Sequence, residues 1–177
     1  MTEVNKLIKE IRIYGDSGLR KVSEKIDIVD EKIETLLNDM AETMYAAPGV
    51  GLAAPQIGIN QRAIVIDTDG VLIKAVNPEI IESSRELENA EEGCLSVPGV
   101  YEKVKRAKTV KVKYLNEKGE EVIMEADALL ARAFQHEIDH LDGNLFVDKI
   151  SAVAKKLSSN KLARLKKDTM KKMKKEI

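Results

Sequence analysis

Apolar residues recur at helical spacing in the first third of the chain. Between residues 33 and 44 they stand three or four positions apart, which places them on one face of a helix. Asp30 is suited to cap the start of this helix, and Pro48-Gly49 ends it. The pattern therefore predicts an amphipathic helix that packs against a core through Ile33, Leu36, Leu37, Met40, Ala41 and Met44.

The middle of the chain changes to the shorter period of β-strands. A buried apolar run covers residues 63–66, and Asp69-Gly70 offers a hairpin turn into residues 71–76. Apolar and polar residues alternate over residues 110–114, and the next turn leads to a returning strand at 121–124. Strands joined by short turns pair in opposite directions, so mainly antiparallel sheet is expected here.

Two further helices are expected in the last third of the chain. The first begins near Asp127, a good N-cap, and ends at Gly143, where a left-handed residue is common. The second covers about residues 159–175 and has a thin apolar stripe, so it needs to dock on the rest of the protein. Helices before and after a sheet region predict an α+β fold, with mainly antiparallel sheets packed around the helix at 127–143. The apolar residues of these two helices are Leu130, Ala133, Phe134 and Leu141 in the first and Leu162, Leu165 and Met173 in the second.

Length and charge divide the chain into a body and a tail. The 177 residues fit one domain. Residues 151–177 carry ten Lys/Arg and two acids, a net charge of +8, while residues 1–150 carry 19 basic and 28 acidic groups, a net charge of -9. A basic tail on an acidic body could dock on a polyanion such as RNA, although a solvated helix face is an equal alternative.

The composition also bears on the compartment. No run approaches the ~20 apolar residues of a membrane span. Residues 1–6 lack a basic region followed by an apolar stretch, so no signal peptide is expected. Cys94 is the only cysteine and has no partner for an internal disulfide, which favours a reducing, cytoplasmic setting.

The most informative segment is 135–140, which contains His-Glu-x-x-His. His136 and His140 are the only histidines, and their spacing in a helical pattern lets both imidazoles reach one metal ion. Glu137 lies beside them and can contact a water held by that ion. Two unrelated helix histidines are the alternative, but spacing, glutamate and helical context agree on a metal site. The motif alone does not say which hydrolase this is.

Two histidines leave a catalytic metal site one ligand short, because such sites usually have three protein ligands and an open position for water. Downstream of His140 the chain offers four carboxylates but no histidine or cysteine. Cys94 lies upstream. A lone cysteine is more often a small buried hydrophobe, but two histidines that need a partner favour Cys94 as the third ligand.

Residues 49–58 form a glycine-rich segment. Glycines here let the backbone approach a ligand or another segment closely, and the spacing matches no phosphate-binding motif. Gln56 could donate a hydrogen bond to a polarised carbonyl oxygen. A packed turn with a surface glutamine is the alternative that spacing alone leaves open.

Taken together, these segments resemble the peptide deformylase family. Its motifs Gly-x-Gly-x-Ala-Ala-x-Gln, Glu-Gly-Cys-x-Ser and Gln-His-Glu-x-Asp-His stand here at 49–56, 92–96 and 135–140, in the family's order. The resemblance spans roughly residues 10–150. It implies a peptide deformylase catalytic domain over residues 1–150, with 151–177 as a basic helical extension of the same domain.

The resemblance implies a role for each matching residue. Metal binding falls to Cys94, His136 and His140. Glu137 acts as general base and then acid on a metal-activated water, while Gln56 and the backbone N–H of Leu95 hold the developing oxyanion. Glu92 supports the site. The substrate-binding residues are Val50, Gly51 and Gly93, and Phe134 is expected to wall a methionine pocket.

The resemblance also implies the partners and the reaction. The substrate is an N-formylmethionyl nascent polypeptide, which is hydrolysed to release formate. The cofactor is one divalent metal ion, Fe(2+) in the cell, for which Ni(2+), Co(2+) or Zn(2+) can substitute. A cytoplasmic monomer is expected, with the ribosome as a candidate partner of the basic C-terminal helix and no membrane partner.

Two other functions compete with this hypothesis. A metallo-endopeptidase also uses His-Glu-x-x-His, but the upstream cysteine and the missing downstream ligand count against it. A ribosome-associated RNA binder with a structural metal would want four ligands, and only three candidates converge.

Overall fold

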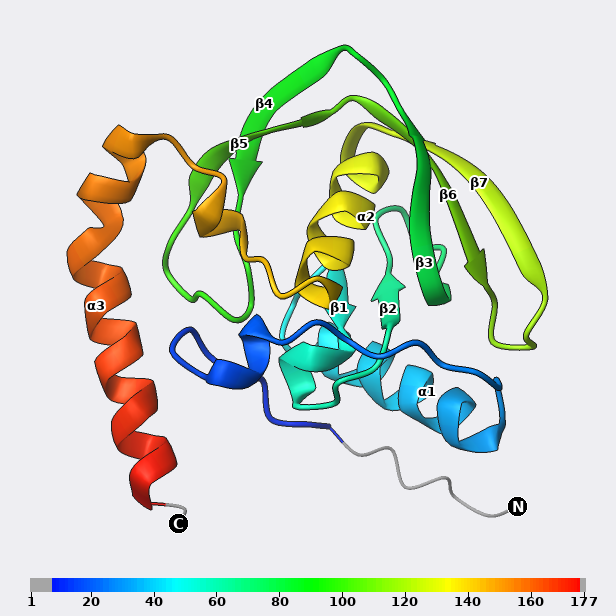
Figure 1. Ribbon diagram of the computed structural model, residues 1–177, viewed down its shortest axis with the longest axis horizontal. Helices are drawn as coiled ribbons and strands as arrows, with labels where there is room; N and C mark the ends of the chain where they lie inside the picture. Colours follow the sequence, from blue (N-terminus) through cyan, green and yellow to red (C-terminus); the bar gives the residue numbers. More distant parts are fainter. Residues whose placement is uncertain (1–7, 176–177) are drawn as a thin grey trace.

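The computed structural model describes residues 8–175, so the signal-peptide expectation, which concerns residues 1–6, lies outside the described residues. Three α-helices, seven strands and three 3₁₀ turns form within this range (Figure 1). None of the described helices is long and apolar enough to cross a membrane. The helices are α1 (Glu31–Ala46), α2 (Ala128–Leu141) and α3 (Ala152–Lys175), and the 3₁₀ turns are η1 (Ser17–Arg20), η2 (Ala54–Ile57) and η3 (Phe146–Asp148). The strands are β1 (Gly51–Ala53), β2 (Ala63–Ile66), β3 (Ile73–Ser83), β4 (Leu87–Glu92), β5 (Glu102–Ala107), β6 (Thr109–Leu115) and β7 (Glu121–Asp127).

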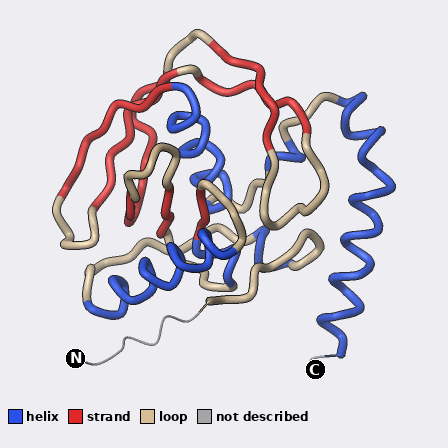
Figure 2. Tube along the Cα trace, turned by 180° about the vertical axis from the view of Figure 1, so that it is seen from behind, coloured by secondary structure: helices blue, strands red, loops and turns tan. Residues whose placement is uncertain are grey.

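The strands form two antiparallel sheets. The larger has the order β1-β2-β3-β6-β7, and the smaller pairs β4 with β5. Figure 1 shows α2 between the two sheets, and Figure 2 shows the same arrangement from behind, with α3 at one side of the molecule beside β4 and β5. The predicted α+β class and the central position of the metal-site helix are therefore confirmed.

Strand β2 is buried on both faces and joins two cores. Ile64 and Ile66 belong to the core under α2, whereas Ala63 and Val65 belong to the core under α1. Alternate residues of a strand point to opposite faces, so this short strand separates the two helices. A continuous apolar run is what such a position requires, as the sequence pattern indicated.

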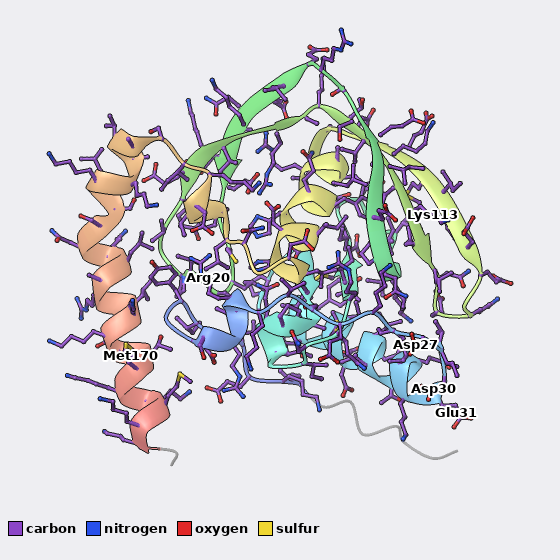
Figure 3. The ribbon with its side chains drawn as sticks, in the orientation of Figure 1. Arg20, Asp27, Asp30, Glu31, Lys113 and Met170 are labelled. Atoms are coloured by element: carbon purple, nitrogen blue, oxygen red, sulfur yellow. The ribbon has the colours of Figure 1, made fainter. Side chains whose placement is uncertain are left out.

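Helix α1 agrees with its prediction. The Asp30 side chain accepts hydrogen bonds from the backbone N–H groups of Lys32 and Ile33, which satisfies donors that a helix start otherwise leaves unpaired. Asp30 and Glu31 stand at one end of the helix in Figure 3, where acidic groups favour the positive end of the helix dipole. The six predicted apolar residues are all buried.

Helix α2 also begins at the predicted residue, although without the predicted side-chain capping. Asp127 occupies the N-cap position, but its side chain makes no capping hydrogen bond. Gly143 follows the helix with φ +75°, and a Cβ there would lie 2.6 Å from the Arg20 carbonyl oxygen, so glycine is required. Phe134 and Leu141 are fully buried in the core.

Other elements differ from the sequence prediction. Helix α3 begins at Ala152, seven residues before the predicted start. Strand β3 extends to Ser83, beyond the predicted end at 76, and its pairing with β6 is irregular. Strands β1, β4 and β5 were not predicted. Strand β4 is mostly exposed and charged, so it lacks the apolar alternation on which strand prediction depends.

Helix α3 docks on the body at its middle. Leu162 is buried in a cluster with Val97 and Val100, and the Lys161 ammonium donates to the Gly99 carbonyl oxygen over 2.7 Å. A Cβ on Gly15 would lie only 2.8 Å from the Cα of Lys166, so glycine permits the close approach of the helix. The expected docking of this helix is therefore present.

Candidate active site

Helix α2 presents both histidines to the same side. His136 and His140 lie one turn apart, with ring centroids 5.1 Å from each other. Both residues are buried, His140 almost completely. The spacing argument made from the sequence is confirmed, because residues four apart share a helix face.

Cys94 joins the two histidines from the loop that follows β4. Its Sγ lies 3.3 Å from His140 Nε2, and the ligand atoms of Cys94, His136 and His140 all lie within 4.8 Å of one another. Bonds of about 2.3 Å to sulfur and 2.0–2.1 Å to nitrogen at a tetrahedral ion set two such ligands about 3.5 Å apart, so the three residues fit one metal ion. No further His, Cys, Asp or Glu joins this group within residues 8–175. A three-ligand set leaves a position open, as catalytic sites require.

A buried carboxylate orients one of the rings. Glu92 Oε2 lies 2.9 Å from His136 Nδ1, which turns His136 Nε2 toward the other ligands. The same carboxylate accepts two hydrogen bonds from Arg106 and one from Arg132. Burial alone raises the pKa of Glu92, but the hydrogen bonds from Arg106 and His136 outweigh it and hold that pKa well below its ordinary value. Glu92 is therefore ionised and fixed in place.

The two histidines differ in how strongly they hold a proton. Burial, followed by the charges of His136 and Arg106, holds the pKa of His140 well below its ordinary value, which keeps this imidazole neutral as a metal ligand must be. Burial also lowers the pKa of His136, but its contacts with Cys94 and Glu92 prevail and raise it. A proton is therefore held more strongly by His136, between Cys94 and Glu92, than by His140.

Glu137 lies beside the ligands with its carboxylate against β1. A Cβ built on Gly51 would come within 2.4 Å of Glu137 Oε1, so only glycine leaves room for this carboxylate. Burial raises the pKa of Glu137 to about 7. Its buried Oε2 has no hydrogen-bond partner in the described part of the chain. An unpaired carboxylate of near-neutral pKa suits a group that accepts and returns a proton.

Gln56 is held with its amide nitrogen toward the cluster. Its Oε1 accepts from the Ala53 backbone N–H over 2.8 Å, which fixes the orientation of the amide. Its Nε2 donates to Ser96 Oγ over 3.1 Å and lies 3.6 Å from Cys94 Sγ. Gln56 is 2 % exposed, so it is part of the site and does not belong to a surface turn.

A small cavity opens next to these groups. It has a volume of about 150 Å³ and is bordered by Gln56, Cys94, Leu95, His136 and Glu137. The remaining wall is formed by residues from β1 and the position before it, β4, the loop after β4 and α2: Val50, Gly51, Glu91, Glu92, Gly93, Leu129, Arg132 and Ala133. The structure thus brings every site residue expected from the sequence to one place, with one exception. Phe134 does not line this cavity, because it points into the core and packs against Tyr114.

Comparison with known proteins assigns the family. The sequence model of the family described as polypeptide deformylase matches residues 8–156. The peptide deformylase of Fusobacterium nucleatum is 48% identical over 166 residues, which cover 92% of this chain and 95% of the relative. That of Acetivibrio thermocellus is 56% identical over 143 residues, covering 81% of this chain and 84% of the relative.

The chain belongs to the polypeptide deformylase family.

Solved structures of this family have the same fold. A peptide deformylase from Legionella pneumophila superposes with a TM-score of 0.85 at 46% identity, covering 91% of this chain and 96% of the other. The one from Thermotoga maritima gives 0.80 at 47% identity, with 82% and 99% covered. The family and the hydrolase class expected from the three motifs are confirmed, and the endopeptidase and RNA-binder hypotheses give way to them.

Several residues of the site had no signal in the sequence. Arg106 and Arg132 reach Glu92 from β5 and α2, and Arg106 also pairs with Asp139. The first two contacts span 14 and 40 positions of the chain, so no local pattern reveals them. Leu129 and Ala133 of the cavity wall could have been found from the motif, because they precede Glu137 by eight and four positions on the same helix face.

Proposed function

We propose that the chain hydrolyses the formyl amide of N-formylmethionyl nascent polypeptides, with Glu137 as general base and then general acid. Removal of the formyl group is the activity of the family to which the chain belongs. One observation supports the substrate and the role of Glu137 proposed here. The ligand group of Cys94, His136 and His140 lies next to the Glu137 carboxylate and the Gln56 amide at one cavity.

The metal is proposed to be a single divalent ion held by Cys94, His136 and His140. When bound, it supplies Lewis acidity that lowers the pKa of water and polarises the formyl oxygen. One sulfur and two imidazoles suit several divalent transition ions. We assign Fe(2+) in the cell, with Ni(2+), Co(2+) or Zn(2+) as substitutes, on the resemblance of the motifs.

The protein groups then act in sequence. Glu137 accepts a proton from the water that attacks the formyl carbon. Gln56 Nε2 and the Leu95 backbone N–H donate hydrogen bonds to the oxygen that becomes negatively charged, and no described residue accepts from that N–H. One such donor contributes about 3–4 kcal/mol, or 10²–10³ in rate. Glu137 finally returns its proton to the leaving amine, and formate is released.

The substrate is proposed to lie along Val50, Gly51 and Gly93. These residues border the 150 Å³ cavity from the start of β1 and the position before it and from the loop after β4, and Gly51 and Gly93 offer backbone without side chains. A cavity of this size accepts one side chain of the size of methionine. The discrimination among apolar first residues should be modest, since one methylene in an apolar site is worth about 1–3 kcal/mol.

The tail is proposed to be an extension of the catalytic domain, with residues 1–150 as its body and 151–177 as its basic helix. The burial of Leu162 and the hydrogen bond from Lys161 to Gly99 support this. The outer face of α3 carries most of the tail's lysines and is a candidate for docking on ribosomal RNA. We also propose a cytoplasmic location, which the single cysteine favours, and a monomer.

A turnover assay with metal analysis tests this function. The purified chain loaded with Fe(2+) or Ni(2+) under nitrogen should release formate from formyl-Met-Ala-Ser and leave an internally cleavable, unformylated peptide intact. The metal-to-protein ratio should be near one, and Cys94→Ser should lower it. Cleavage of the internal peptide without formate release would assign the site to endoproteolysis.

A further inference from the structure

Asp67 ties together the two ends of the short connection between α1 and β1. This connection, residues 47–50, follows the last turn of α1 and enters β1 at Gly51. The Asp67 carboxylate accepts a hydrogen bond from the Tyr45 hydroxyl over 2.6 Å, and the Asp67 backbone N–H donates to the Val50 carbonyl oxygen over 2.8 Å. One residue therefore holds the chain both just before the connection and at its end.

The position of Asp67 follows from the larger sheet. Gly51 pairs with Ile66, the last residue of β2, so Val50 and Asp67 are the next pair along the same two antiparallel strands. The turn after β2 fixes the side chain, because Asp67 Oδ1 accepts from the Gly70 backbone N–H over 2.7 Å. Its Oδ2 is the oxygen that meets the hydroxyl from α1. Asp67 is thus a fixed anchor at the end of β2.

The Tyr45 hydroxyl donates to an ionised carboxylate. The hydrogen bond from Tyr45 is the main reason that the pKa of Asp67 lies below its ordinary value, and the same bond raises the pKa of Tyr45. Hydrogen bonds to a charged acceptor are shorter and stronger than those between neutral groups. Tyr45 is 49% exposed, so removal of its hydroxyl group should not disturb the core.

The anchored segment packs against two groups of the active site. A Cβ built on Gly49 would lie 2.8 Å from Leu95 Cδ1, and one built on Gly51 would lie 2.4 Å from Glu137 Oε1. The backbone of residues 49–51 therefore touches the side chain of the proposed oxyanion donor and the carboxylate of the proposed general base. Because the packing is this close, a shift of the backbone would remove the support of both groups on that side.

We propose that Tyr45 and Asp67 are positioning residues for deformylation, because their hydrogen bond holds residues 47–51 against Leu95 and Glu137. The inference rests on the proposed function, since these two groups act in that reaction. Neither Tyr45 nor Asp67 borders the active-site cavity, so both act through the segment between them. A misplacement of about 1 Å can cost 10²-fold in rate, so a smaller shift of this segment should still be measurable.

Tyr45→Phe removes the hydroxyl group and leaves the ring. With Ni(2+) bound and formyl-Met-Ala-Ser as substrate, this variant should have a kcat about three- to tenfold below that of the unsubstituted enzyme, with a smaller change in KM. The metal content should be unchanged, and the backbone amides of residues 47–51 should exchange hydrogen faster, which mass spectrometry can follow. Asp67→Asn should retain most of the kcat, because a carboxamide can still accept from the Gly70 N–H and donate to the phenol oxygen.

Asn38→Ala is the matched control. Asn38 is an exposed residue of α1 about two turns before Tyr45, and it accepts a hydrogen bond from the Lys74 ammonium of β3 over 2.8 Å. Its substitution removes a similar connection between the same helix and the same sheet, away from the anchored segment. The kcat and the exchange at residues 47–51 should both stay at the values of the unsubstituted enzyme.

The outcomes separate this inference from the proposed function. Formate release by the unsubstituted enzyme together with an unchanged kcat in Tyr45→Phe overturns the positioning role and leaves the deformylase function standing. The same conclusion follows if the kcat falls without faster exchange at residues 47–51, or if Asn38→Ala lowers the kcat equally. Absence of formate release by the unsubstituted enzyme overturns both.

Discussion

Adding one methyl group at Gly51 should impair catalysis by displacing Glu137. The new Cβ would lie 2.4 Å from Glu137 Oε1, whereas ordinary contact begins at 3.4 Å, so the carboxylate oxygen must move by about 1 Å. A misplacement of about 1 Å can cost 10²-fold in rate, or about 2.7 kcal/mol in transition-state free energy. We therefore expect Gly51→Ala to reduce kcat/KM about 10²-fold.

The assay is formate release from formyl-Met-Ala-Ser, with metal content and thermal unfolding measured on the same samples. The metal content should stay near one ion per chain, because Gly51 touches none of the three ligands in the contacts around its Cβ position. Gly18→Ala serves as a matched control. A Cβ there meets only the Asp16 side chain, at 3.1 Å, in the η1 turn.

A double-mutant cycle decides whether the loss acts through Glu137. In a Glu137→Gln background most of the turnover is already gone, so Gly51→Ala should cost little more, and the coupling between the two sites should be large. If Gly51→Ala costs the same factor in both backgrounds, the methyl group acts on the substrate or on the strand, and the reasoning about the carboxylate is refuted.

Four further outcomes are expected. Gln56→Ala should lower kcat by 10²–10³ with little change in KM, because it removes a donor to the developing oxyanion; an unchanged kcat would exclude that role. Glu137→Ala should retain the metal, measured by elemental analysis, and lose most turnover, while loss of the metal would make Glu137 structural. The iron form should lose activity in air faster than the nickel form, with Cys94 sulfinic or sulfonic acid detected by mass spectrometry; equal lifetimes would contradict this. Asp148→Asn should reduce the free energy of unfolding by about 1 kcal/mol at pH 7. Burial raises the pKa of Asp148, but the hydrogen bonds from Arg20 prevail and lower it, so this contribution is present above about pH 5 and fades as the pH falls below about 4, which urea titrations at several pH values can check. A difference that grows toward low pH would show that the pKa is not lowered.

The same ion pair illustrates what links distant segments of the chain. Arg20 of η1 lies near the centre of the molecule in Figure 3 and contacts Asp148 of η3, although 128 positions separate them. On the periphery of the same view, Lys113 and Met170 stand on exposed strand and helix surfaces. Long-range pairs of this kind hold the N-terminal segment against the region that follows α2.

The parts of the fold predicted from the sequence are those with a local cause. Helix α1 has a clear apolar period and a capping Asp30, and both histidines needed only the period of α2 to be placed together. Cys94 was assigned because two ligands require a third, and the structure places its sulfur within reach of His140. The metal-ligand set was thus predictable although its members come from two elements.

The parts of the fold and of the site that were not predicted depend on tertiary contacts. Strand β4 consists largely of exposed polar residues, and it is extended because its backbone pairs with β5. In the early turns of α3, Val153 and Leu157 are exposed and do not continue the stripe that contains the buried Leu162, so the start of the helix was missed. The ion pairs of Glu92 with Arg106 and Arg132 join three elements, and only folding brings them together.

The contacts that hold α2 in place do not involve the metal ligands. Phe134 and Leu141 anchor the helix in a core of fully buried side chains, and the Gln135 amide exchanges two hydrogen bonds with the Ala107 backbone. These contacts form whether or not a metal ion is bound. The chain should therefore stay folded when no metal ion is bound, and adding the ion should restore activity without new synthesis of the protein.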